Sequence, residues 1–171
     1  MTTPPRRILG IDPGSHRTGY GIIDARGNRI SPVAWGVVRT DATESFPDRL
    51  HRIHEKLSEV ILRHKPTEAA IENVFLAKNA ASALKLGQAR GAAIVTCCIH
   101  GVPVHEYSAK EIKLAATGYG AAPKEQVCAM VRRLLGIREE VGPDAADALA
   151  MAFCRAVTRP VPGPAAPLPR K

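Results

Sequence analysis

Polar and apolar residues in the first forty positions of the chain follow the alternation of short β-strands. The apolar run at 8–11 predicts a buried strand, which Pro13-Gly14 ends abruptly. Two more strands are expected over 18–24 and 30–39, each reached through a short turn. Because the connections are too short for a crossover, the three strands should form an antiparallel meander.

Beyond residue 40 the periodicity becomes helical, with short apolar runs between the helices. Apolar residues share one helix face from residue 47 to residue 65, and the run at 68–72 follows through this helix, so we expect it to pair in parallel with the first strand. The remaining elements are, in order, a helix over 79–99, a strand over 103–107, and helices over 108–118, 124–135 and 143–158. This order predicts an α/β fold with a mixed five-stranded sheet, three antiparallel strands and then two parallel ones, covered by helices on both faces.

A single domain is expected over residues 1–158. The chain has 171 residues, which is enough for one core. Residues 159–171 are rich in proline and have no apolar periodicity, so we expect a disordered tail there.

The net charge points to a polyanionic partner. The chain has 24 Lys and Arg against 16 Asp and Glu, a formal charge of +8. Nine Lys or Arg and three Glu lie between residues 73 and 138, so this middle region carries most of the excess. Nucleic acid is favoured over a membrane surface, because we find neither a basic amphipathic anchor nor an apolar run of membrane-spanning length. The N-terminus lacks the features of a signal peptide, which predicts a cytoplasmic protein.

Cysteine and histidine residues give no pattern of a metal site. The four cysteines, Cys97, Cys98, Cys128 and Cys154, form no C-x-x-C pair, and the six histidines show no matching spacing. We therefore expect buried thiols, not zinc ligands or disulfides.

Four acidic residues stand out because of where they lie. Asp12 ends the first strand and Glu72 ends the fourth, so both should emerge at the same edge of the sheet. Asp144 and Asp147 are spaced i, i+3 and share one helix face. Simpler roles exist for two of them, since Asp12 could begin a turn and Asp144 could interact with the helix dipole. Asp147 lies within an apolar helix, where a carboxylate needs a cation.

A cluster of hard oxygen ligands beside a basic surface indicates metal-dependent cleavage of a phosphodiester. Carboxylates select magnesium or manganese. In two-metal hydrolysis, ions about 3.5–4 Å apart stabilise the attacking and leaving oxygens, and Asp12 would bridge them. The basic residues would follow the DNA backbone, and Phe75 would stack on or wedge between bases, although core packing is the commoner fate of a lone phenylalanine. The candidate DNA contacts are Phe75, Lys78, Lys85, Arg90 and Lys110.

Taken in order, six stretches resemble the RuvC family of bacterial Holliday junction resolvases. They are ILGIDPG at 8–14, TGYG at 18–21, IENVF at 71–75, AKN at 77–79, ALKLGQARG at 83–91 and DAADALA at 144–150. The resemblance extends from about residue 7 to residue 158, and the set is far more specific than any one stretch.

The resemblance implies a ribonuclease H-like fold and a homodimer that nicks two opposed strands of four-way junction DNA. It implies two magnesium ions per active site, with manganese as a substitute, and cooperation with the branch-migration proteins RuvA and RuvB. The catalytic residues it implies are the metal ligands Asp12, Glu72, Asp144 and Asp147, with Lys113 and Lys124 near the scissile phosphate. Phe75 matches an aromatic residue that disturbs bases at the junction centre.

Two other functions are compatible with parts of the sequence. Sugar-kinase and actin-like ATPases share the Gly-Ile-Asp-x-Gly loop, but they need two such domains and give no reason for Glu72 or the Asp144/Asp147 pair. A non-catalytic junction-binding module would keep the basic surface without needing all four carboxylates.

Overall fold

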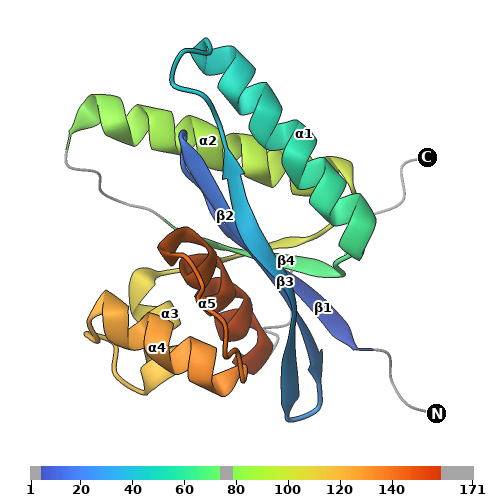
Figure 1. The fold of residues 1–171 in the computed structure, drawn as a ribbon, viewed down its shortest axis with the longest axis vertical. Coiled ribbons are helices and arrows are strands. Elements are labelled where there is room, and N and C mark those ends of the chain that lie inside the picture. Colours follow the sequence, from blue (N-terminus) through green and yellow to red (C-terminus); the bar gives the residue numbers. More distant parts are fainter. Residues whose placement is uncertain (1–4, 74–78, 159–171) are drawn as a thin grey trace, which may run out of the picture.

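The computed structural model describes residues 5–73 and 79–158 and contains the predicted mixed sheet (Figure 1). Its strands are β1 (Arg6–Asp12), β2 (Arg17–Arg26), β3 (Arg29–Arg39), β4 (Glu68–Glu72) and β5 (Val104–Tyr107), in the order β3-β2-β1-β4-β5. The first three strands are antiparallel neighbours, whereas β1 pairs with β4 and β4 with β5 in parallel. The predicted fold class is confirmed.

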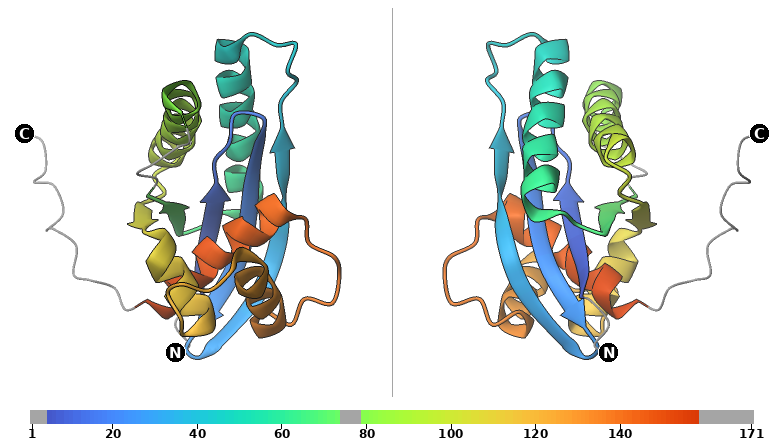
Figure 2. Two further views of the ribbon diagram at one scale, coloured as in Figure 1. Left: turned by 90° about the vertical axis from the view of Figure 1, so that its left-hand side faces the viewer. Right: turned by 90° about the vertical axis from the view of Figure 1, so that its right-hand side faces the viewer.

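Two groups of helices cover the two faces of this sheet (Figures 1 and 2). On one face lie α1 (Phe46–His64) and α2 (Ala80–Ile99), and on the other lie α3 (Ala109–Thr117), α4 (Lys124–Leu134) and α5 (Pro143–Val157). The start of α3 is fixed by a capping box in which Ser108 and Glu111 bond each other's backbone, as the sequence predicts.

Alternation along β1 divides the interior into two cores. Ile8 packs with α3, α4 and α5, while Leu9 and Ile11 pack with α1 and α2. Successive strand residues point to opposite faces, so odd and even positions of β1 belong to different cores. All three side chains are at most 1% exposed. By the same alternation Asp12 belongs to the face that α5 covers.

Two glycines let α5 lie almost against the strands. A Cβ atom at Gly10 of β1 would come within 1.8 Å of the Ala148 carbonyl oxygen, and one at Gly19 of β2 within 2.1 Å of the Asp144 carbonyl oxygen. Both are backbone atoms, so a side chain could be accommodated only by moving the helix. These glycines therefore fix the distance between the sheet and the helix that carries Asp144 and Asp147.

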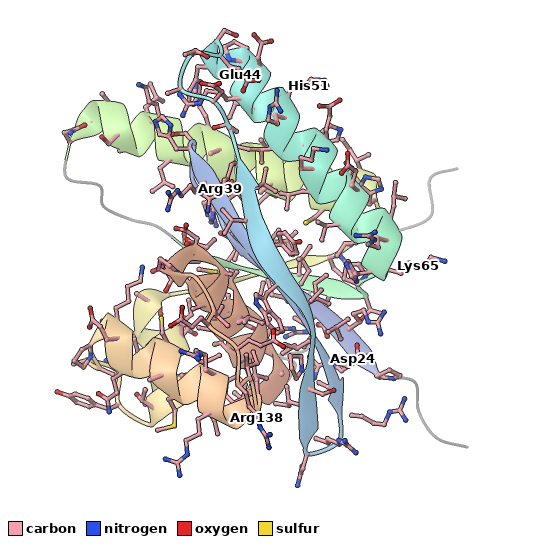
Figure 3. All side chains as sticks on the ribbon, in the orientation of Figure 1. Asp24, Arg39, Glu44, His51, Lys65 and Arg138 are labelled. Carbon is pink, nitrogen blue, oxygen red and sulfur yellow. The ribbon has the colours of Figure 1, made fainter. Side chains whose placement is uncertain are left out.

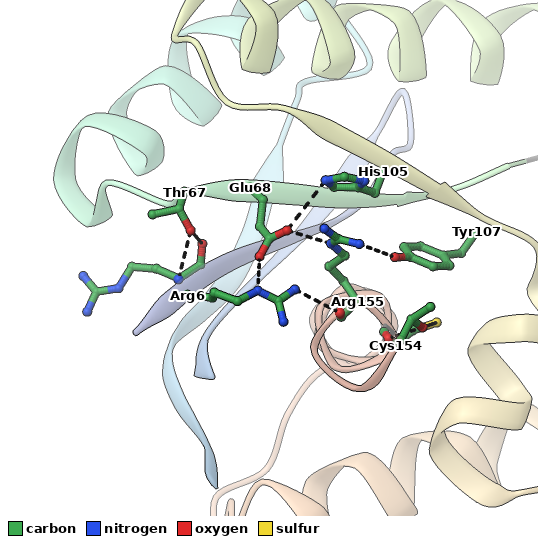
Figure 4. A network of polar contacts seen from close by, with 9 residues as sticks. Arg6, Thr67, Glu68, His105, Tyr107, Cys154 and Arg155 are labelled. Atoms are coloured by element: carbon green, nitrogen blue, oxygen red, sulfur yellow. Dashed lines mark hydrogen bonds and ion pairs between the residues drawn. The ribbon is translucent and has the colours of Figure 1, made fainter. Parts of the chain in front are cut away.

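The opposite end of the sheet is closed by a polar network around Glu68, the first residue of β4 (Figure 4). The Glu68 carboxylate accepts hydrogen bonds from Nε of Arg6 and Nε of Arg155, each at 2.7 Å. His105 Nε2 lies 3.6 Å from the same carboxylate, and Arg155 also donates to the Tyr107 hydroxyl at 3.3 Å. These contacts join the last turns of α5 to β1, β4 and β5.

The prediction of four buried thiols is wrong for Cys98. Cys97 and Cys154 are buried and Cys128 is half-buried, but Cys98 is exposed. Adjacent residues of a helix point about 100° apart, so Cys97 can face α1 while Cys98 faces solvent. All four thiols are free. In the part of the chain that the structure describes, no helix is long and apolar enough to cross a membrane.

Candidate active site

Asp12 and Glu72 lie beside each other at one edge of the sheet, as predicted. The parallel register pairs Ile11 of β1 with Ile71 of β4, so the next residue of each strand is an acid. In β4, Ala69 and Ile71 pack toward α1 and α2, whereas Ala70 packs toward α5. Glu72 therefore belongs to the same face as Asp12.

The other two acids reach this edge from the start of α5. Asp144 lies in the first turn of α5 and Asp147 follows one turn later. The side chain of Asp144 is 27% exposed and that of Asp147 is 19% exposed. Since the Asp144 carbonyl lies against Gly19, opposite Asp12 in the β1–β2 register, this turn is held directly over the end of β1.

Burial, followed by repulsion between the acids, dominates the electrostatics of this edge. The pKa of Asp12 is raised to about 7, first by burial and then by the negative charge of Asp147, with smaller contributions from Asp144 and Glu72. The pKa of Glu72 is also raised, again by burial and by Asp147. The other three acids predicted from the sequence therefore lie close enough to Asp12 to raise its pKa.

Two lysines and two of the acids line a pocket of about 240 Å³. Its polar lining consists of Glu72, Lys113, Lys124 and Asp147, and its apolar lining comes from α3, α4 and α5. The ammonium group of Lys124 forms an ion pair with Asp147, which raises the lysine's pKa. Lys113 and Lys124 each lower the pKa of Glu72, opposing its repulsion by Asp147.

Two further contacts of these acids were not predicted from the sequence. Arg17, at the start of β2, places Nη1 3.8 Å from Oδ2 of Asp144. The Cys128 thiol donates to Oδ1 of Asp147 at 3.7 Å. Cys128 follows Lys124 by one helical turn, so the i, i+4 spacing could have suggested that both side chains contact the same residue, Asp147. Nothing in the sequence pattern singles out Arg17.

The chemistry of the site fits a divalent cation. Carboxylate oxygens are hard ligands, and a cation placed among these acids would relieve the repulsion between them. Within residues 5–73 and 79–158, no three acidic, histidine or cysteine side chains are arranged to hold one ion together. Lys124 supplies a balancing positive charge to Asp147.

The predicted DNA contacts have different surroundings. Lys85 and Lys110 are exposed on α2 and α3. Arg90 is turned inward, because its Nε donates to the Glu72 carbonyl oxygen at 2.9 Å and Nη2 pairs with Glu106. It therefore supports the backbone at Glu72. Phe75 and Lys78 lie outside the described residues.

Comparison with known proteins gives a consistent result. A family model described as crossover junction endodeoxyribonuclease RuvC matches residues 8–155. A protein with that name from Geobacter sulfurreducens is 56% identical over 150 residues, which are 88% of this chain and 92% of the relative. One from Coxiella burnetii is 52% identical over 92% of this chain and 91% of the relative. The structure of Thermus thermophilus RuvC in complex with a Holliday junction substrate has a TM-score of 0.83 at 36% identity, covering 88% of this chain and 93% of that one.

Proposed function

This chain belongs to the RuvC family of crossover junction endodeoxyribonucleases, and from that premise we infer how its residues cleave a junction. It is an endodeoxyribonuclease that depends on a divalent metal and resolves Holliday junctions during recombination and repair. The observation that best supports the assignment of the site is the convergence of Asp12, Glu72 and the first turns of α5 at one edge of the sheet, where burial and neighbouring acids raise the pKa of Asp12. Asp12, Glu72, Asp144 and Asp147 are therefore our candidate metal ligands.

We propose that the ions are magnesium, replaceable by manganese, and that there are two in each active site. Four acids carry enough negative charge for two divalent ions, and no soft ligand among the described residues lies beside them apart from the half-buried Cys128. Bound there, the ions supply activation of water and stabilisation of charge on the phosphate oxygens.

Before DNA binds, the protein's own cations hold the acids in place. Lys124 neutralises Asp147, and Arg17 lies beside Asp144. Lys113 and Lys124 line the same pocket as Glu72 and Asp147. There they can bind phosphate oxygens and face the charge that develops in the transition state. Phe75 and Lys78 stay predicted contacts with the junction.

The function is tested by incubating the purified protein with a synthetic four-way junction carrying a mobile core. We expect symmetric nicks in two opposed strands with magnesium or manganese, no nicks with EDTA, and ends that a ligase can seal. Binding of the junction without nicking in either metal would instead support a non-catalytic junction-binding module.

Lys113→Ala and Lys124→Ala are expected to slow single-turnover nicking even when all the DNA is bound. Each variant removes a positive charge from the wall of the acidic pocket, where one favourable contact in the transition state is worth roughly 10²–10³-fold in rate. Lys85→Ala is the control, because Lys85 is exposed on α2 and does not line this pocket.

If the two lysines only follow the DNA backbone, their effects should disappear at saturating protein. The variants would then weaken binding about equally for any DNA and reduce the salt-dependence slope by about one unit. Full rates for both at saturation would remove them from the catalytic residues.

We propose a homodimer in which α2 packs against its symmetry mate, because nicking two opposed strands calls for two sites related by a two-fold axis. Leu84, Val95 and Ile99 are exposed apolar residues of α2. Leu84→Glu should halve the mass measured by light scattering. Leu62→Glu on α1 is the control, since Leu62 and Leu84 are each 64% exposed. A dimer that survives Leu84→Glu would contradict this interface.

RuvA and RuvB are the proposed partners in branch migration.

A further inference from the structure

Among the residues that the structure describes, two arginines are buried, and they have different partners. Arg155 is 8% exposed and is paired with Glu68 at the far end of the sheet. Arg49, in the first turn of α1, is 6% exposed, but no carboxylate among the described residues lies within ion-pairing distance of it. A buried guanidinium without an acid is costly unless other acceptors form hydrogen bonds with its N–H groups. The position of those acceptors shows what Arg49 does.

The guanidinium of Arg49 is directed at one backbone carbonyl. Its Nε and Nη2 donate to the Ser15 oxygen at 3.0 and 2.5 Å, and Nε also lies 3.3 Å from Thr40 Oγ1. The Thr40 hydroxyl donates to the same Ser15 oxygen at 2.7 Å. The ring of Phe46 covers the guanidinium, with its centroid 5.4 Å away.

Ser15 belongs to the short loop that joins Asp12 to Arg17, and this loop is held from both sides. On its inner side the buried Thr18 hydroxyl donates to the Gly14 carbonyl oxygen at 2.9 Å. On its outer side the Thr40 amide donates to the His16 carbonyl oxygen at 3.1 Å. Thr40 lies in the connection from β3 to α1, between the labelled Arg39 and Glu44 (Figure 3).

We propose that Arg49 is a positioning residue for the metal site: through the Ser15 carbonyl it fixes the loop that orients the Asp12 carboxylate and brings Arg17 to Asp144. Its contacts are with Ser15, Thr40 and Phe46, not with the acids. The inference rests on the metal site of the proposed function. An arginine suits this position because its planar fork places two donors on one oxygen and a third contact on a hydroxyl, whereas a lysine offers a single flexible ammonium.

The test is the affinity for Mn²⁺, measured without DNA by the loss of the free-ion electron paramagnetic resonance signal. Arg49→Gln removes the guanidinium that bonds the Ser15 carbonyl oxygen, and it leaves no acid unpaired. It should weaken Mn²⁺ binding by roughly 10-fold or more, as is usual for groups that orient metal ligands. Arg155→Lys is the control. It changes the other buried arginine while keeping a charge beside Glu68, so it should lower the melting temperature and leave Mn²⁺ affinity unchanged.

A second pair of variants covers the case in which Arg49→Gln fails to fold. Thr40→Val removes the hydroxyl that, like Arg49, donates to the Ser15 carbonyl oxygen, and Thr40→Ser retains this hydroxyl. We expect weaker Mn²⁺ binding for the valine variant and wild-type binding for the serine variant. Wild-type affinity in both Arg49→Gln and Thr40→Val would overturn the proposal, as would an equal loss in Arg155→Lys.

Failure of the metal site itself would look different. In that case the unmodified protein would not bind Mn²⁺, and Asp12→Asn would change nothing. If the unmodified protein binds Mn²⁺ and Asp12→Asn weakens it, the site stands, and only the role of Arg49 is decided by its variants.

Discussion

Asp147→Asn is expected to abolish junction nicking while leaving junction binding intact, and Asp12→Asn and Glu72→Gln should do the same. Each substitution removes one carboxylate ligand and keeps the side chain's shape. Metal ions contribute several kcal/mol of transition-state stabilisation in such sites, which corresponds to a rate loss of at least roughly 10³-fold. Binding should not weaken, because each variant makes the surface facing the DNA less negative.

Single-turnover nicking measured beside a gel-shift titration separates the two effects. Asp24→Asn is the control: Asp24, labelled in Figure 3, is an acid of the same sheet, but it pairs with Arg7 near the start of β1 and does not line the pocket. It should nick at the wild-type rate. Near wild-type nicking by Asp147→Asn would remove that residue from the metal ligands.

The same site predicts an unusual pH dependence for the metal-free protein. Because the pKa of Asp12 is raised to about 7 from an ordinary value near 3.8, the folded state holds this proton more tightly than the unfolded state. Ionised Asp12 therefore destabilises the fold, and the penalty grows as the pH rises from about 4 to about 7. Asp12→Asn should melt at a higher temperature than the wild type at pH 8, and the difference should shrink toward pH 5. Equal melting curves at pH 8 would contradict the crowding of the acids.

Local periodicity made the fold and most of the candidate site predictable. Alternation in β1 and β4 indicates which residues face each core, and it places Asp12 and Glu72 at one edge once the two strands are parallel. The i, i+3 spacing of Asp144 and Asp147 needs only a helix. Gly10 belongs to the family pattern, but the physical reason for a glycine there becomes visible only in three dimensions: a Cβ atom would lie 1.8 Å from a carbonyl oxygen of α5.

Side-chain pairing over long sequence separations could not be predicted. The guanidinium of Arg90 bonds the carbonyl of Glu72 and the side chain of Glu106, and neither contact follows from the sequence pattern. Arg49 is separated from Ser15 by 34 residues, and a charged residue in a first helical turn gives no sign of burial. Such contacts depend on which loops the tertiary fold brings together, and periodicity carries no information about that.

Glu68→Gln is expected to cause a large loss of stability without touching the active site. Glu68 and Arg155 have side chains only 9% and 10% exposed, so a neutral amide would leave the arginine buried without its counter-charge. Removing one partner of a buried pair typically costs about 3–5 kcal/mol. For a chain of this size that lowers the melting temperature by on the order of 10 °C.

The pH dependence of this variant gives a second, independent check on Glu68. Burial alone would raise the pKa of Glu68, but hydrogen bonds from Arg6 and Arg155 lower it below its ordinary value. A lowered pKa contributes stability above the ordinary value near 4.5, and that stability is lost as the pH falls further. The gap in melting temperature between wild type and Glu68→Gln should therefore persist from pH 8 to pH 5 and close as the pH falls below the ordinary value.

Glu59→Gln is the control, because its pair with Lys56 at 2.8 Å is about half exposed and should contribute no more than about 1 kcal/mol. If the two variants melt at the same temperature at pH 7, the network around Glu68 does not hold α5 to the sheet.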